Sequence, residues 1–146
     1  MTRSEMATEF FLSGYNCAQS VAMAFADLIG LDEKFVAKAV SPFGGGMGRM
    51  REVCGAVSGM YFVLGILYGY DSAADKEGKK RLYEEVQLLA DKFRRKNGSI
   101  ICREILKNPS SETTLSERTK EYYDMRPCAR MVKSAAELLD EFIKEH

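Results

Sequence analysis

The segment from Glu52 to Tyr68 limits the possible folds more than any other, because apolar residues cover most of its faces. A helix that is apolar all round must be surrounded by other elements, so this segment predicts a buried central helix. Gly55 and Gly59 stand four residues apart on one face, which would let a neighbouring helix approach closely. The most apolar part, from Met60 to Leu67, is too short for a membrane span of about 20 residues.

Apolar residues recur at helical spacing along the rest of the chain as well. Leu82, Val86, Leu89 and Phe93 form one stripe of a helix expected from about 73 to 96. The same spacing predicts helices over about 5–12, 16–28 and 127–144, and a short helix that opens at Asp32. No alternation typical of strands is present, and the polar stretch 108–114 is interpreted as a loop. We expect an all-α fold in which residues 1–146 form a single-domain helical bundle.

The cysteines of the chain share one kind of position, the first turn of a predicted helix. They are Cys17, Cys54, Cys102 and Cys128. A helix N-terminus carries about half a positive charge and free N–H groups, which favour thiolate over thiol. Because thiolate is the form that attacks disulfides and binds soft metals, all four are candidate catalytic residues and candidate metal ligands.

The cysteine spacing contains no C-x-x-C pair, so it does not indicate a thioredoxin-like motif, a zinc ribbon or a ferredoxin-like run. The single histidine, His146, is the last residue, which excludes a Cys–His nucleophile pair and a histidine-ligated haem. The cofactor is left unknown, although four thiolates without histidine suit zinc or an iron–sulfur cluster. The competing interpretation is that the cysteines are buried as small apolar residues.

A glycine-rich loop precedes Cys54 in the sequence. Successive N–H groups in such a loop, with two arginines beside them, suit an anion. The loop is neither a Walker motif nor a dinucleotide fingerprint, and the alternative interpretation is a flexible connector. We expect it to form one wall of the cysteine site and to favour the thiolate of Cys54. Its candidate cofactor-binding residues are Gly44, Gly45, Gly46, Gly48, Arg49 and Arg51.

The charge balance bears on the partners and the location of the protein. The 21 lysines and arginines equal the 21 aspartates and glutamates in number, so the footprint of a nucleic-acid-binding protein is missing. The first residues are polar rather than apolar, so we expect no signal peptide and no membrane association. The expected location is cytoplasmic, where static disulfides are uncommon and cysteines are more often free, redox-cycling or metal-bound.

Three stretches of sequence carry a family resemblance: 14–21 (GYNCAQSV), 43–48 (FGGGMG) and 52–59 (EVCGAVSG). Together they resemble the C_GCAxxG_C_C family of redox-active proteins, which is named for four spaced cysteines. The likeness runs from about Ser13 to Cys128, and it implies redox chemistry at all four cysteines. The chain departs from a literal reading of the family name on both sides of the second cysteine. Val53 stands directly before it where the name has glycine, and Gly55 stands directly after it where the name has alanine.

The leading hypothesis is a redox-active protein that transfers electrons through thiol/disulfide pairs or through a cysteine-ligated iron–sulfur or other metal centre. As an enzyme it would be a thiol-dependent or metal-dependent oxidoreductase. Cys17 and Cys54 are the expected pair, and Cys102 and Cys128 would resolve a mixed disulfide or complete a four-sulfur site. The partner would be a redox protein or a small-molecule oxidant or reductant. The alternative is a non-enzymatic metal-binding module or a helical interaction module.

Overall fold

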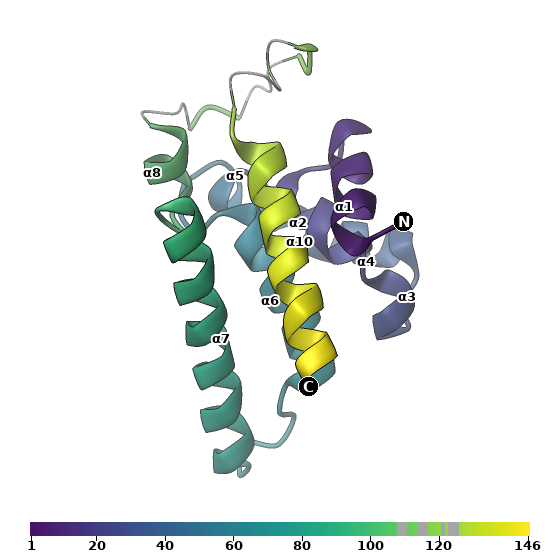
Figure 1. The fold of residues 1–146 in the computed structure, drawn as a ribbon, viewed down its shortest axis with the longest axis vertical. Helices are drawn as coiled ribbons and strands as arrows, with labels where there is room; N and C mark the ends of the chain where they lie inside the picture. Colours follow the sequence, from purple (N-terminus) through teal and green to yellow (C-terminus); the bar gives the residue numbers. More distant parts are fainter. Residues whose placement is uncertain (108–110, 114–116, 121, 123–125) are drawn as a thin grey trace.

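A computed structural model describes residues 1–107, 111–113, 117–120, 122 and 126–146. The predicted all-α fold is confirmed, and most of the predicted loop 108–114 lies outside the described residues. Figure 1 shows α6, α7 and α10 running along the long axis, with the N-terminal helices beside them. The helices are α1 (Arg3–Leu12), α2 (Cys17–Met23), α3 (Ala26–Ile29), α4 (Glu33–Val40), α5 (Gly44–Met47), α6 (Gly55–Tyr68), α7 (Lys76–Asn97), α8 (Cys102–Leu106) and α10 (Cys128–Glu145), with a short 3-10 turn at Ser41–Phe43.

Helix α6 is the buried centre of the molecule, as its sequence predicts. Met60, Val63 and Leu64 on it are fully buried. A β-carbon at Gly59 would lie 2.5 Å from the carbonyl oxygen of Ala18, and one at Gly55 would lie 3.2 Å from the backbone nitrogen of the same residue. Since there is no room for a side chain at Gly59 and little at Gly55, α2 and α6 touch through their backbones.

The last helix, α10, covers α6 and packs on α1, α2 and α7 as well. Its buried face includes Met131, Val132, Ala136, Leu139 and Phe142. This face carries the stripe that predicted the helix, and its charged residues point away from the core. The long helix α7 contributes less, because only a few of its residues, such as Leu89 and Phe93, are buried. None of the described helices has both the length and the hydrophobicity needed to cross a membrane.

The helix expected over 16–28 is in fact two helices, because the chain breaks between Met23 and Ala26. The break frees backbone carbonyls at the end of α2. Arg3 satisfies one of them, since its guanidinium donates a 2.9 Å hydrogen bond to the carbonyl of Ala24 and also pairs with Asp27. The apolar spacing continues across the break, which explains why the pattern predicts one helix. Gly30 ends α3 with a left-handed φ of 70°.

The segment before α6 also differs from the expectation, because residues 52–54 are extended rather than helical. Val53 forms an isolated antiparallel bridge with Ile101. On either side of it, the amide of Cys54 donates to the carbonyl of Ile100 (2.7 Å) and the amide of Cys102 donates to the carbonyl of Glu52 (2.6 Å). Residues 52–54 therefore form backbone hydrogen bonds with residues 100–102 instead of continuing the helix. For this reason α6 begins only at Gly55.

Candidate functional site

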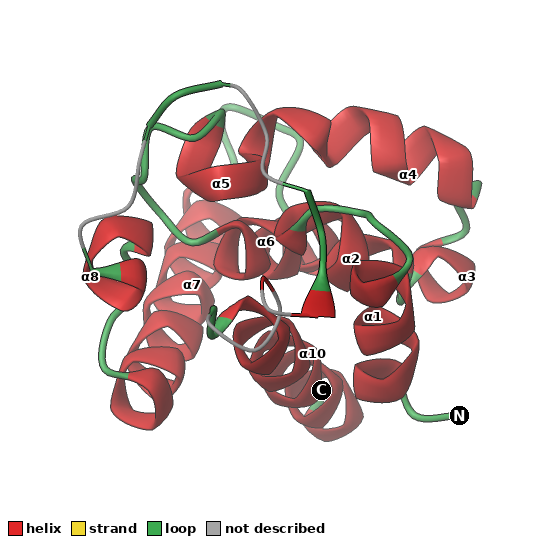
Figure 2. Cartoon of the chain, turned by 90° about the horizontal axis from the view of Figure 1, so that it is seen from above, coloured by secondary structure: helices red, strands yellow, loops and turns green. Residues whose placement is uncertain are grey.

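All four cysteines lie at helix starts, which confirms the expectation from the sequence. Cys17, Cys102 and Cys128 are the first residues of α2, α8 and α10, and Cys54 is the N-cap of α6. Figure 2 shows α5, α8 and the starts of α6 and α10 gathered at one end of the molecule. Four helix starts that are far apart in the sequence therefore lie near one another in the folded chain.

The first cysteine is held by a reciprocal cap. Asn16 accepts a hydrogen bond from the amide of Gln19 (2.9 Å), and the Gln19 side chain accepts one from the amide of Asn16 (3.0 Å). Both side chains also reach the neighbouring segment, where they donate to the carbonyls of Ser41 and Ala37. This network fixes the first turn of α2 and with it the direction of the Cys17 side chain.

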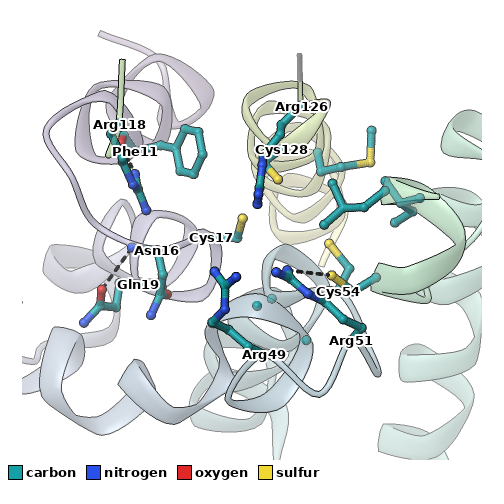
Figure 3. A pocket seen from close by; sticks show the side chains of 18 of the residues that line it. Phe11, Asn16, Cys17, Gln19, Arg49, Arg51, Cys54, Arg118, Arg126 and Cys128 are labelled. Atoms are coloured by element: carbon teal, nitrogen blue, oxygen red, sulfur yellow. Dashed lines mark hydrogen bonds between the residues drawn. The ribbon is translucent and has the colours of Figure 1, made fainter. Parts of the chain in front are cut away.

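A cavity of about 590 Å³ lies where these helix starts meet, and all four cysteines line it. In Figure 3 the labelled cysteine and arginine side chains point into a shared space from different elements. Four arginines and several apolar side chains complete the wall. Its members include Phe11, Asn16, Gly44, Gly45, Gly46, Arg49, Arg51, Ile105, Leu106, Arg118, Tyr122, Arg126 and Met131.

Cys17 and Cys128 interact directly through a hydrogen bond between their side chains. The Cys17 thiol keeps its proton and donates the hydrogen bond, so its pKa is raised well above the ordinary value, first by this bond and then by burial. Cys128 receives the bond, and its pKa is lowered to about 7 by that bond and by the charges of Arg126, Arg51 and Arg118. One half-buried thiol of the pair is therefore ionised near neutral pH while its neighbour is protonated.

Cys54 and Cys102 have a different environment, since they are only 6% and 8% exposed. Burial raises the pKa of Cys54 to about 12, although the amides of Ala56 and Val57 at the start of α6 favour its thiolate. Burial also raises the pKa of Cys102, against the effect of Arg51, whose Nη1 lies 3.7 Å from its sulfur. We expected the loop arginines beside Cys54, but the guanidinium of Arg51 contacts Cys102.

The glycine loop forms a left-handed turn on the cavity wall. Gly45, Gly46 and Gly48 all have positive φ, and so do Arg49 and Arg51. A β-carbon at Gly46 would lie 2.7 Å from the β-carbon of Cys102 and 2.8 Å from the amide nitrogen of Glu52. Gly44, Gly45 and Gly46 line the cavity, whereas Gly48 turns the chain outside it.

The donor set raises the question of a metal. Four thiolates without histidine suit zinc or an iron–sulfur cluster. Within the part of the chain that the structure describes, however, no three cysteine, histidine or acidic side chains are grouped closely enough to hold one ion. The guanidinium groups that line the same cavity would also repel a cation. The arrangement of the described residues thus fits a dithiol better than a metal centre.

Two residues of the site carry no motif and were not predicted. Arg126 stands two residues before Cys128, and this spacing is the signal in the sequence that places its charge near that sulfur. Arg118 gave none, because its place depends on a 2.9 Å hydrogen bond from its guanidinium to the carbonyl of Phe11 in α1. Only the folded chain brings these distant segments together.

Comparison with known proteins supports the relation that the motifs indicate. No curated protein and no solved structure matches the chain. A family model does match, over residues 15–142, and its description reads "Putative redox-active protein (C_GCAxxG_C_C)". The match includes all four cysteines, the glycine loop and most of α10. The chain therefore belongs to the C_GCAxxG_C_C family of redox-active proteins.

Proposed function

We propose that this chain is a single-domain cytoplasmic thiol–disulfide oxidoreductase, with Cys128 and Cys17 as its reactive pair. The observation that carries the proposal is the hydrogen bond between these two side chains on the wall of an arginine-lined cavity. The family description supports redox activity in general, and the contact supplies the pair. The substrate is a disulfide of a small molecule or of a partner protein, and the product is two thiols.

In the first step, the thiolate of Cys128 attacks one sulfur of the substrate disulfide. A bond forms between the Cys128 sulfur and that substrate sulfur, and the other half of the substrate leaves as a thiolate. The hydrogen bond from Cys17 and the charges of the nearby arginines lower the pKa of Cys128 to about 7, so a large fraction of it is ionised at neutral pH and supplies the nucleophile. Its position at the start of α10 adds the partial positive charge of a helix N-terminus.

In the second step, Cys17 resolves the mixed disulfide. The Cys17 thiol loses its proton to water or to the departing thiolate, and its sulfur attacks the sulfur of Cys128. The second half of the substrate leaves as a thiolate, and a Cys17–Cys128 disulfide results. The pair loses two electrons and the substrate gains them. Once Cys128 is in the mixed disulfide, it no longer carries the charge that raised the pKa of Cys17, so the resolving thiol ionises more readily.

The remaining site residues are proposed to support this pair. Cys54 and Cys102 are buried, and their raised pKa values make them poor nucleophiles at neutral pH. Arg51 lies against Cys102 and is itself 5% exposed, so its charge is fixed in place beside the cavity. The glycine turn lets Arg49 and Arg51 approach the cysteines without a side chain in between. Their role is to favour the Cys128 thiolate and to hold the substrate.

The test is to trap each stage of the reaction. Fully reduced protein is mixed with a small disulfide, and the products are mapped by mass spectrometry. We expect a Cys17–Cys128 disulfide in the natural chain, an accumulating mixed disulfide on Cys128 in the Cys17→Ser variant, and neither in Cys128→Ser. Four unreactive thiols would support a helical interaction module instead. Stoichiometric zinc, or iron with sulfide, in anaerobically purified protein would support the metal-binding alternative.

A further inference from the structure

Apart from the cysteines, the charged side chains among the described residues that line the cavity are all cationic. The guanidinium groups of Arg49, Arg51, Arg118 and Arg126 line it, and no carboxylate side chain is found among its described lining residues. Figure 3 shows Arg49 and Arg51 on one loop, Arg126 at the start of α10 and Arg118 beside Phe11, with their side chains around the space that holds Cys17 and Cys128. A group of like charges around two sulfur atoms is an environment for an anion rather than for a neutral or cationic molecule.

The closeness of these arginines affects the pKa of Arg49. The pKa of Arg49 is lowered, first by burial and then by the charges of Arg51 and Arg126. The charges of Arg51 and Arg126 therefore disfavour the charged form of Arg49. A bound anion would relieve this repulsion, so the folded site gains from anion binding even before specific hydrogen bonds are formed.

The volume of the cavity and the apolar part of its wall indicate an organic anion. The cavity volume of about 590 Å³ lies within the range of roughly 300–1,000 Å³ that is usual for small-molecule sites. Phe11, Ile105, Leu106 and Met131 contribute apolar surface. An inorganic oxyanion would fill a small part of this space and would leave the apolar side unused.

We propose that the cavity binds a small-molecule disulfide that carries carboxylate groups, with Arg126 and Arg49 holding the carboxylates and Cys128 facing a substrate sulfur. Guanidinium groups match carboxylates in geometry and can bind them through two parallel hydrogen bonds. The inference rests on the proposed function and names its substrate class. The chemistry is the exchange already described, so each turnover consumes one disulfide and two cysteine thiols and yields two carboxylate-bearing thiols.

The experiment compares three small disulfides of similar length and different charge. Dithiodiglycolate carries two carboxylates, hydroxyethyl disulfide is neutral and cystamine carries two ammonium groups. The second-order rate constant of the reduced protein with each is divided by that of a simple free thiol, which removes the intrinsic reactivity of each disulfide. We expect the normalised preference for dithiodiglycolate over the neutral compound to be about tenfold or more, since hydrogen bonds to charged groups contribute that much. Cystamine should react the slowest of the three.

Variants of Arg126 separate binding from activation of the nucleophile. Arg126→Gln changes the pKa of Cys128 and therefore slows all three disulfides, but the preference for the dianion should fall at least about threefold. Arg126→Lys should retain most of that preference, because it keeps the charge. Arg94→Gln is the matched control, since Arg94 lies on α7 outside the cavity lining and pairs with Asp91 there; it should leave the preference unchanged.

The outcomes distinguish the two proposals. A preference that is the same in the natural chain and in Arg126→Gln, or a preference for cystamine, would overturn the anionic substrate while the thiol–disulfide function stands. Reaction with a disulfide-bonded protein substrate alone would do the same. If neither the three small disulfides nor a disulfide-bonded protein is reduced, the proposed function itself is wrong. A preference that weakens as salt is added supports the inference, because salt screens the charges.

Discussion

The thiol of Cys17 at the start of α2 donates a hydrogen bond to the sulfur of Cys128 at the start of α10, so the two thiols ionise at different pH values. The bond keeps Cys17 protonated and lowers the pKa of Cys128 to about 7. It joins the first and the last cysteine of the sequence through two helices that both pack on the central helix α6. This one contact gives the site a nucleophile and a resolving thiol.

The first prediction concerns the pH dependence of Cys128. Its alkylation rate by iodoacetamide should rise with pH and reach half of its maximum near 7, because the thiolate is the reacting form. Cys17→Ala removes the hydrogen-bond donor and should move this midpoint up, towards the ordinary value near 9. The rate at Cys128 is measured by mass spectrometry of the labelled peptide.

The matched control is Cys17→Ser, which keeps a hydroxyl donor at the same place. It should leave the midpoint of Cys128 closer to that of the natural chain than Cys17→Ala does. Equal midpoints in all three proteins would show that the hydrogen bond has no effect on Cys128, and the arginines alone would then account for its ionisation.

The second prediction tests the close contact of α2 and α6. Gly59→Ala places a β-carbon 2.5 Å from the carbonyl oxygen of Ala18, so the two helices must move apart. We expect the free energy of unfolding to fall by about 2 kcal/mol or more, as for other overpacked positions. Urea unfolding followed by circular dichroism measures it.

Gly65→Ala in the same helix is the control for this substitution. A β-carbon at Gly65 meets nothing within 4 Å, and alanine favours a helix by about 1 kcal/mol over glycine. This variant should therefore be slightly more stable than the natural chain. Similar losses in both variants would contradict the tight packing of α2 on α6.

Much of the fold follows from local sequence patterns. The apolar stripes predict α7 and α10 to within a few residues, and the all-round apolar segment predicts the buried α6. What the patterns miss depends on distant partners. The break between Met23 and Ala26 is stabilised by Arg3, and residues 52–54 are extended because they pair with 100–102. A sequence pattern has no information about either contact.

The candidate site shows the same division. The helix-start positions of the cysteines are local features, and the sequence predicts them. The pairing is not local, since Cys17 was expected to act with Cys54, whereas in the folded chain its thiol donates a hydrogen bond to Cys128. Arg118 reaches the cavity from a segment without a motif. These relations are set by how α1, α2 and α10 pack, and spacing along the chain does not reveal them.

The third prediction separates the glycine loop as a cavity wall from the loop as a connector. Gly46→Ala combines a φ of 71° with a β-carbon 2.7 Å from that of Cys102, so both the loop and Cys102 must shift. We expect lower stability and faster alkylation of Cys102, because its burial is disturbed. Thiol labelling and urea unfolding measure the two effects.

Gly48→Ala gives the matched comparison. Its φ of 57° and ψ of 35° are left-handed too, but the nearest atom to an added β-carbon is 4.0 Å away. It should cost about 1 kcal/mol of backbone strain and leave the reactivity of Cys102 unchanged. If Gly46→Ala behaves in the same way as Gly48→Ala, the loop is only a connector.

The fourth prediction concerns alkaline pH and Cys54. Its pKa is raised to about 12 in the folded protein from an ordinary value near 9, so its contribution to stability is fully present below 9. Above that value the unfolded chain loses the proton and the folded chain keeps it. The free energy of unfolding should then fall by about 1.4 kcal/mol per pH unit until the pH reaches the folded pKa. Urea unfolding at a series of alkaline pH values measures this slope.

Cys54→Ser removes the titration while it keeps the size of the side chain. Serine is a favoured N-cap, and its oxygen can accept hydrogen bonds from the amides of Ala56 and Val57 that now face the sulfur. The variant should therefore fold normally at neutral pH and lose stability less steeply than the natural chain above about pH 9. Equal alkaline slopes in the two proteins would mean that the Cys54 thiol is ionised as easily in the folded chain as in the unfolded one, and that its burial at the start of α6 does not protect its proton.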